Sequence, residues 1–142
     1  MKILLKIRND SFGSGAFGSP RTRNGISYKH TGEDYACVPG SMVLSDVEGT
    51  IIRNGFCYEG NKILQLTVIK DRQGYQHKYL YITPTHEAGD EVKAGDIIGV
   101  SLSLQLKHPP KQGERMTDHV HYEICLGSTI IEPAKWRGAF GK

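Results

Sequence analysis

The chain has 142 residues, which is typical of one domain, and its 38% hydrophobic and 23% charged residues are those of an ordinary globular protein. No apolar run approaches the roughly 18–20 residues that cross a bilayer, so we expect no membrane insertion. The net charge is only +3 and no stretch holds five or six like charges, so we also expect no nucleic-acid partner.

The N-terminal segment carries a short apolar stretch within residues 1–8 that Lys6 interrupts. A secretory signal needs roughly 7–15 apolar residues, so we predict no signal peptide and synthesis in the cytoplasm. Residues 11–19 read SFGSGAFGS, which is typical of a flexible segment. We therefore interpret residues 1–16 as an N-terminal strand and a Gly/Ser-rich lead-in, and residues 17–142 as the single folded domain.

Short β-branched or alternating segments dominate the chain beyond residue 20. Strands are predicted over 41–47, 49–53, 62–70, 75–82, 97–106, 119–126 and 128–131. Residues 71–74 predict a hairpin turn, and Gly127 predicts a second one. This spacing indicates a mainly β fold, a single-domain antiparallel sheet or sandwich.

The first polar cluster reads His30-Thr31-Gly32-Glu33-Asp34. In a straight strand His30 and Asp34 would lie about 13 Å apart, too far to share a metal ion. Gly32 permits a bend that brings both side chains together, because glycine has no Cβ. Taken alone, the cluster is equally consistent with a polar turn.

The second cluster is His119-Val120-His121-Tyr122-Glu123. On a strand, His119 and His121 point to the same face, and Val120 and Tyr122 point to the other. The two imidazoles can bind one metal, or one can bind while the other handles protons. Together the two clusters supply His30, Asp34 and His121, and two imidazoles with one carboxylate favour Zn²⁺.

These motifs resemble the peptidoglycan-cleaving M23 metallopeptidases of the lysostaphin/LytM type. The resemblance covers roughly residues 17–136. It rests on the pieces HTGED (30–34), VPGSMV (38–43), EGTI (48–51), EAGDEVKAGDIIG (87–99) and HVHYE (119–123), which occur in the family's order and spacing.

The resemblance implies an antiparallel β-sheet cleft with zinc on its floor. Within it, His30, Asp34 and His121 would be the metal ligands. His119 would be a catalytic histidine that orients or deprotonates the attacking water. The implied activity is hydrolysis of peptide bonds in bacterial peptidoglycan.

One departure from the family concerns its Y-x-H motif, which falls at residues 79–81 and places Tyr81 where the second catalytic histidine is expected. A tyrosine hydroxyl can donate a hydrogen bond to a developing oxyanion, but its pKa near 10 makes it a poor base. We expect His77, Tyr79 and Tyr81 to share one strand face. His77 and Tyr79 are accordingly substrate-cleft candidates, and His77 is an alternative to Tyr81.

A wall-cleaving enzyme without a signal peptide is typical of a bacteriophage, which can deliver such a protein to the wall. The resemblance therefore predicts a phage tail- or baseplate-associated lysin or an endolysin, with other tail proteins as partners. The alternative is a catalytically weakened or inactive structural or peptide-binding component of a phage tail, which the Tyr81 replacement favours. The long polar loop over 102–118, with His108 and Met116, is expected to form one wall of the cleft.

Overall fold

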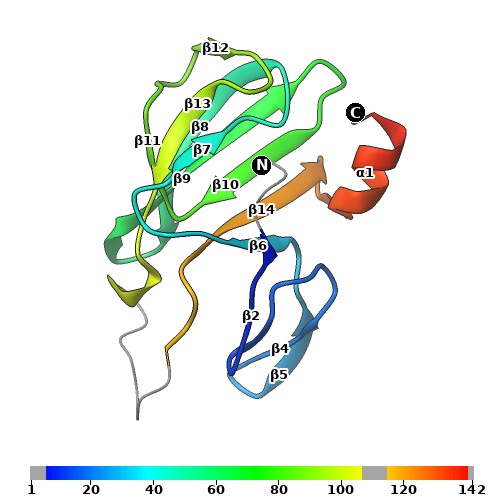
Figure 1. The fold of residues 1–142 in the computed structure, drawn as a ribbon. Helices are drawn as coiled ribbons and strands as arrows, with labels where there is room; N and C mark the ends of the chain where they lie inside the picture. The colour runs from blue at the N-terminus through cyan, green and yellow to red at the C-terminus, as the bar shows by residue number, and fades with distance from the viewer. Residues whose placement is uncertain (1–5, 107–114, 141–142) are drawn as a thin grey trace.

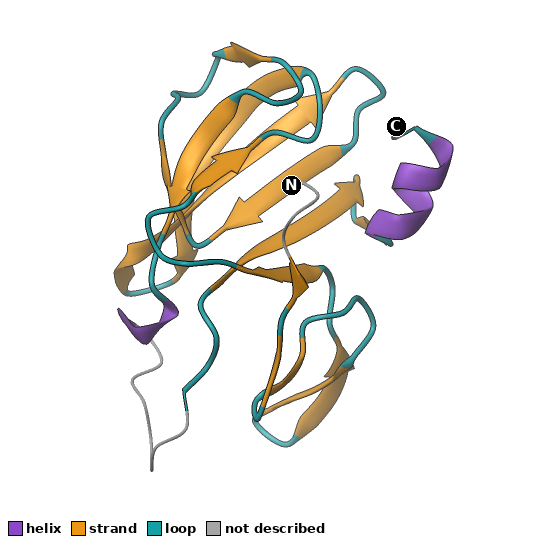
Figure 2. Cartoon of the chain, viewed as in Figure 1, coloured by secondary structure: helices purple, strands orange, loops and turns teal. Residues whose placement is uncertain are grey.

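The computed structural model describes residues 6–106 and 115–140, and antiparallel strands make up most of it (Figure 2). The predicted mainly β, antiparallel fold is confirmed. Among the described residues, no helix is both long enough and apolar enough to cross a membrane.

The main sheet has eight strands and brings distant parts of the sequence together (Figure 1). In spatial order it contains β1 (Lys6–Ile7), β6 (Glu33–Ala36), β14 (His119–Leu126), β10 (Gln76–Leu80), β9 (Asn61–Asp71), β8 (Gly49–Tyr58) and β12 (Glu91–Val92), and β15 (Thr129–Ile131) pairs with β14. The pairing of β6 with β14 sets the two polar clusters side by side, with Asp34 opposite His121.

Three smaller sheets complete the β structure of the described residues. They contain β11 (Ile82–Pro84), β13 (Ile97–Ser101) and β7 (Met42–Leu44); β2 (Asn9–Asp10) and β3 (Gly13–Ser14); and β4 (Pro20–Arg23) and β5 (Ile26–Lys29). The β4–β5 hairpin extends below the main sheet in Figure 1 and leads directly into His30.

The core lies on one face of the main sheet, and alternation along β14 selects it. Val120, Tyr122 and Ile124 are buried in a cluster with Tyr79 and Trp136. Because side chains alternate along a strand, His119 and His121 must point to the opposite face. The predicted division of this strand between two faces is therefore present.

A short helix closes the apolar face, and the sequence analysis did not predict it. Helix α1 (Pro133–Ala139) begins at a proline, whose fixed φ suits the first helical position. Its Trp136 packs edge-on against His77, with ring centroids 4.8 Å apart. Arg137 pairs with Glu33 on β6 at 2.8 Å, so the helix is tied to the strand that carries Asp34.

Several element boundaries differ from the predicted ones. Strand β8 continues to Tyr58, beyond the predicted end at residue 53. The strand predicted over 97–106 ends at Ser101, and a 3₁₀ turn, η1 (Leu104–Leu106), follows it. Within residues 1–16, for which the sequence predicts an N-terminal strand and a lead-in, β1 pairs with β6 and the chain then folds back through β2 and β3. The domain boundary at residue 16 stays a prediction.

Candidate metal centre

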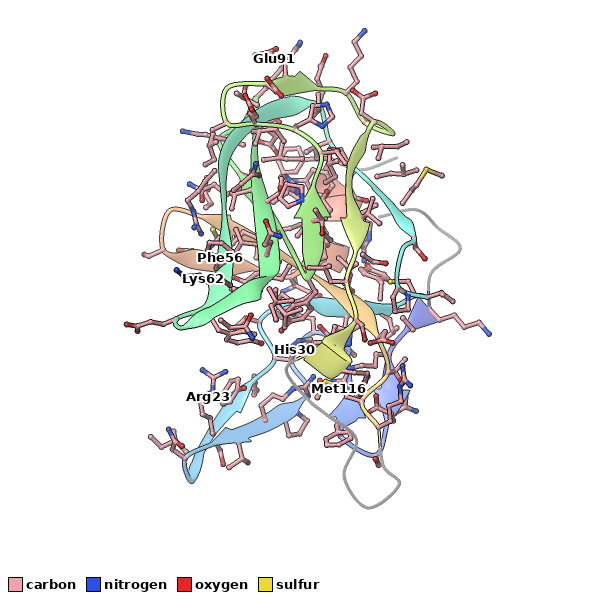
Figure 3. All side chains as sticks on the ribbon, turned by 90° about the vertical axis from the view of Figure 1, so that its left-hand side faces the viewer. Arg23, His30, Phe56, Lys62, Glu91 and Met116 are labelled. Carbon is pink, nitrogen blue, oxygen red and sulfur yellow. The ribbon has the colours of Figure 1, made fainter. Side chains whose placement is uncertain are left out.

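Three ligand-type atoms converge where β6 and β14 meet. His121 Nδ1 lies 2.9 Å from Asp34 Oδ1, and His30 Nε2 lies 3.2 Å from each of these two atoms. All three side chains are buried. Figure 3 shows His30 between the hairpin that carries Arg23 and the β8–β9 end that carries Phe56 and Lys62.

The size of this triangle fits a zinc ion. Tetrahedral zinc with bonds of about 2.0–2.1 Å places its ligand atoms roughly 3.3 Å apart. The three atoms here are 2.9–3.2 Å apart. Two imidazoles and one carboxylate also match the donor types that zinc prefers.

Hydrogen bonds outside the triangle fix the orientation of both histidines. His30 Nδ1 lies 3.2 Å from the carbonyl oxygen of Ala16, which can only accept, so Nδ1 donates and Nε2 keeps its lone pair. His121 Nε2 donates to Glu123 Oε1 at 3.1 Å, which leaves Nδ1 for the triangle. Such outer partners are typical of histidines that bind metals.

The electrostatics of the triangle favour positive charge beside the Asp34 carboxylate. Burial raises the pKa of Asp34, but the hydrogen bond from His121 outweighs it and holds that pKa well below its usual value. Burial lowers the pKa of His121, yet its hydrogen bonds to Asp34 and Glu123 raise it overall, to about 9. The Asp34 carboxylate is therefore ionised beside a protonated His121, and a metal ion bound at this point would take the place of that proton.

The predicted bend at Gly32 is present and turns the chain from His30 into β6. A Cβ at Gly32 would lie 2.3 Å from the carbonyl oxygen of Tyr122 and 2.9 Å from His121 Nε2. Glycine is required here because β6 approaches β14 too closely for any side chain. This close approach is what brings His30 and Asp34 to the same point.

His119 lies next to the triangle on the same face of β14. Its Nδ1 donates to the carbonyl oxygen of Thr117 at 2.7 Å, so Nε2 is the nitrogen that faces the site, 3.6 Å from Asp34 Oδ2. Burial lowers the pKa of His119 below 6.5, more than the charge of Asp34 raises it. A neutral imidazole with a free Nε2 is suited to accept a proton.

Tyr81 reaches the site through an unusual backbone conformation. It occupies the break between β10 and β11 with φ +75°, in a region that non-glycine residues rarely adopt. Its ring lies edge-on to His119, with centroids 5.3 Å apart, and its hydroxyl oxygen is 2.6 Å from that of Tyr58. Burial raises the pKa of Tyr81 well above 10, so the hydroxyl stays protonated and can act as a donor.

The expectation that His77, Tyr79 and Tyr81 share one face is wrong. The positive φ at Tyr81 reverses the alternation and turns this side chain to the metal face. His77 and Tyr79 are fully buried in the core instead, so the structure does not place them in a cleft. The His77 ring bridges Asp71, at 2.9 Å, and the hydroxyl of Tyr122, at 2.7 Å.

Within the predicted cleft wall over 102–118, residues 107–114, including His108, lie outside the described residues. Leu104 is buried beside Tyr81, with Met116 packed against the same small cluster. The carboxylate of Asp118 accepts hydrogen bonds from the main chain of Leu104 and the hydroxyl of Ser103.

Sequence reasoning missed three residues around the site: Arg8, Tyr58 and Glu123. Glu123 had a usable signal, since it follows His121 by two residues on the same strand and so shares its face. Arg8 and Tyr58 had none, because each meets its partner only through pairing of distant strands. The assignment of His30, Asp34 and His121 as ligands stays a prediction that this geometry supports.

Comparison with known proteins agrees with this architecture. Residues 28–133 match the family "Peptidase family M23". Leukocyte cell-derived chemotaxin-2 of Mus musculus is 30% identical over 119 residues, which are 84% of this chain and 72% of that protein. The chain therefore belongs to peptidase family M23.

Two solved structures show the same fold. The catalytic domain of the antimicrobial peptidase lysostaphin from Staphylococcus simulans is 24% identical with a TM-score of 0.66, over 87% of this chain and 89% of that one. The catalytic domain of a variant of the prophage-encoded M23 protein EnpA from Enterococcus faecalis is 22% identical with a TM-score of 0.64, over 94% and 92%. The lysostaphin-like fold expected from the sequence is thus confirmed.

Proposed function

We propose that this protein is a zinc-dependent endopeptidase that hydrolyses peptide bonds of bacterial peptidoglycan. The observation that carries the proposal is the convergence of His30, Asp34 and His121, with His119 beside them on the same face of the sheet. Membership of peptidase family M23 and the lysostaphin-like fold support a peptidase role.

In the proposed reaction, His30 Nε2, Asp34 Oδ1 and His121 Nδ1 would hold the ion. Bound zinc is a Lewis acid that polarises a peptide carbonyl and makes water a better nucleophile near neutral pH. His119 Nε2 accepts the proton that the attacking water loses. The hydroxyl of Tyr81 donates a hydrogen bond to the oxygen on which negative charge develops.

The roles of His119 and Tyr81 follow from their protonation. His119 donates through Nδ1 to a carbonyl, and burial keeps the ring neutral, so its free nitrogen is a base. Tyr81 has a raised pKa and keeps its proton, so it is a donor and not a second base. The reaction therefore depends on a single histidine for proton transfer.

A second candidate function is peptide binding without hydrolysis. One observation favours it: Tyr81 occupies the position at which the family motif has a second catalytic histidine. A relative at 30% identity is also named as a chemotaxin and not as a peptidase. In that case the metal centre would serve stability or recognition within a structural component.

We further propose that the protein works in a bacteriophage, in the tail or baseplate of the virion or as an endolysin that reaches the cell wall. The likeness to a protein described as prophage-encoded supports this setting. Association with purified tail particles, detected by an antibody to this chain, would test it. Absence from both the particles and the lysate of infected cells would contradict it.

Digestion of purified cell walls separates the two candidate functions. Metal analysis should first give about one zinc per chain, as the three-ligand set requires. Wild-type protein should then release muropeptides, and His119→Ala should release few or none while still binding zinc. Equal failure of both proteins would leave the peptide-binding function.

Tyr81→His is the matching gain-of-function variant. The positive φ at this position directs whatever side chain it carries to the metal face. A histidine there should raise the rate of wall digestion, because it would supply a second group able to transfer protons. A loss of rate with zinc content unchanged would show that the hydroxyl itself is needed.

A further inference from the structure

We propose that Arg8 is a positioning residue of the metal centre, holding one carboxylate oxygen of Asp34 so that only the other oxygen is presented to the ion. The proposal rests on the zinc site of the proposed function. It concerns a residue outside the 28–133 segment that matches the peptidase family.

The two oxygens of Asp34 have separate partners. Oδ1 faces the two histidines of the triangle, at 2.9 and 3.2 Å. Oδ2 accepts a hydrogen bond from Arg8 Nε at 3.2 Å. Only 3% of the Arg8 side chain is exposed, so this ion pair is shielded from water, and removing one partner of such a pair is costly.

The other end of the guanidinium is fixed as well. Arg8 donates through Nη1 to Asp10 Oδ1 at 2.8 Å. The planar guanidinium therefore connects two carboxylates, and its orientation is set by both. A lysine ammonium keeps the charge but cannot reproduce this arrangement, because it is a point charge on a flexible chain.

Main-chain hydrogen bonds hold Arg8 in register with Asp34. The amide of Arg8 donates to the carbonyl of Asp34 at 2.8 Å, the amide of Gly15 donates to the carbonyl of Arg8 at 2.7 Å, and the amide of Asp34 donates to the carbonyl of Gly15 at 2.8 Å. A Cβ at Gly15 would lie 2.6 Å from Asp34 Cβ, so glycine is needed for this contact. Arg8 and Gly15 of the N-terminal segment thus both bond to the main chain of Asp34.

Two other groups among the described residues face Oδ2, and both are farther away. Arg21 Nη2 lies 3.7 Å from Oδ2 and donates to the carbonyl of Ser14 at 2.7 Å. His119 Nε2 lies 3.6 Å from Oδ2. Arg8 therefore makes the closest contact to this oxygen. Its hydrogen bond therefore fixes the direction in which Oδ2 points.

The consequence for the metal is its coordination number. A carboxylate with two available oxygens can bind bidentately, as it often does to calcium. With Oδ2 held by Arg8, Asp34 would offer one bond to the ion, and the three ligands would leave the fourth tetrahedral position open, as catalytic zinc sites require. Arg8 is therefore expected to favour tight, four-coordinate zinc.

The test measures zinc affinity of the folded full-length chain by competition with a chromophoric chelator. Arg8→Gln and Arg8→Lys should both bind zinc about 10- to 100-fold more weakly than wild type, the range found when outer partners of metal ligands are removed. Arg72→Gln is the matched control, because Arg72 is 77% exposed and pairs only with Glu48 among the described residues, and it should match wild type.

A spectroscopic readout separates positioning from folding. Cobalt(II) in place of zinc reports coordination geometry through its visible absorption, and the Arg8 variants should lose the intense bands of a four-coordinate site. If Arg8→Gln does not fold, Arg8→Lys carries the test. Folded variants with wild-type zinc affinity and cobalt spectrum would overturn the proposal, whereas a wild-type protein that binds no zinc would overturn the proposed function itself.

Discussion

Substituting Gly32 by alanine tests whether the close approach of β6 to β14 builds the metal centre. The added methyl group would lie 2.3 Å from the carbonyl oxygen of Tyr122, about 1 Å inside the usual contact distance. That neighbour is main chain in a paired strand, so a side-chain rotation cannot relieve the overlap. Overpacking of this kind costs roughly 1–3 kcal/mol, and we expect the upper end, about 3 kcal/mol.

The same methyl group would lie 2.9 Å from His121 Nε2, so the strands cannot separate without disturbing the triangle. Zinc affinity should therefore fall together with the free energy of unfolding, measured by denaturant titration with and without zinc. Gly138→Ala is the control, because a Cβ there meets nothing within 4 Å and alanine favours a helix. A Gly32→Ala protein as stable as this control, with wild-type zinc affinity, would refute the reasoning.

Three further predictions concern the surroundings of the site. Burial lowers the pKa of His77 below 6.5, so the unfolded chain takes up a proton at a higher pH than the folded chain does. The free energy of unfolding should therefore fall as the pH drops below 6.5, by at most about 1.4 kcal/mol per pH unit, and this dependence should be weaker in His77→Gln when both proteins are denatured over a pH series. Glu123→Gln should weaken zinc binding about 10- to 100-fold, because His121 Nε2 would no longer donate its hydrogen bond to a charged carboxylate. Unchanged zinc affinity in chelator competition would show that Glu123 does not orient His121. Trp136→Ala should cost about 3–5 kcal/mol of unfolding free energy, followed by circular dichroism, and a cost under about 1 kcal/mol would show that α1 adds little to the core.

The sequence predicted the parts of the site that depend on local chain geometry. The shared face of His119 and His121 follows from the alternation of a strand, and the bend at Gly32 follows from a residue type that permits it. Both features are present in the structure. The hairpin turn over 71–74 was likewise predictable, since polar turn residues separate two alternating segments.

The features that could not be predicted depend on single backbone angles or on distant pairing. Tyr81 faces the metal centre because of one positive φ, and its residue type does not indicate that conformation. Arg8 meets Asp34 across 26 residues of sequence, through strand pairing that alternation cannot reveal. Helix α1 was missed because it is only seven residues long and has two buried residues, Pro133 and Trp136, too few for a helical pattern.

The alternation of β14 has a consequence for how the chain selects its native strand pairing. A shift of the β14 register against β6 by one residue would turn Val120 and Tyr122 to the polar face of the sheet. The same shift would turn His119 and His121 into the hydrophobic core. An ion that needs residues from both strands could then find no complete set of donors. Metal binding would thus stabilise only the sheet with the native register, and it would disfavour misaligned strand pairings during folding.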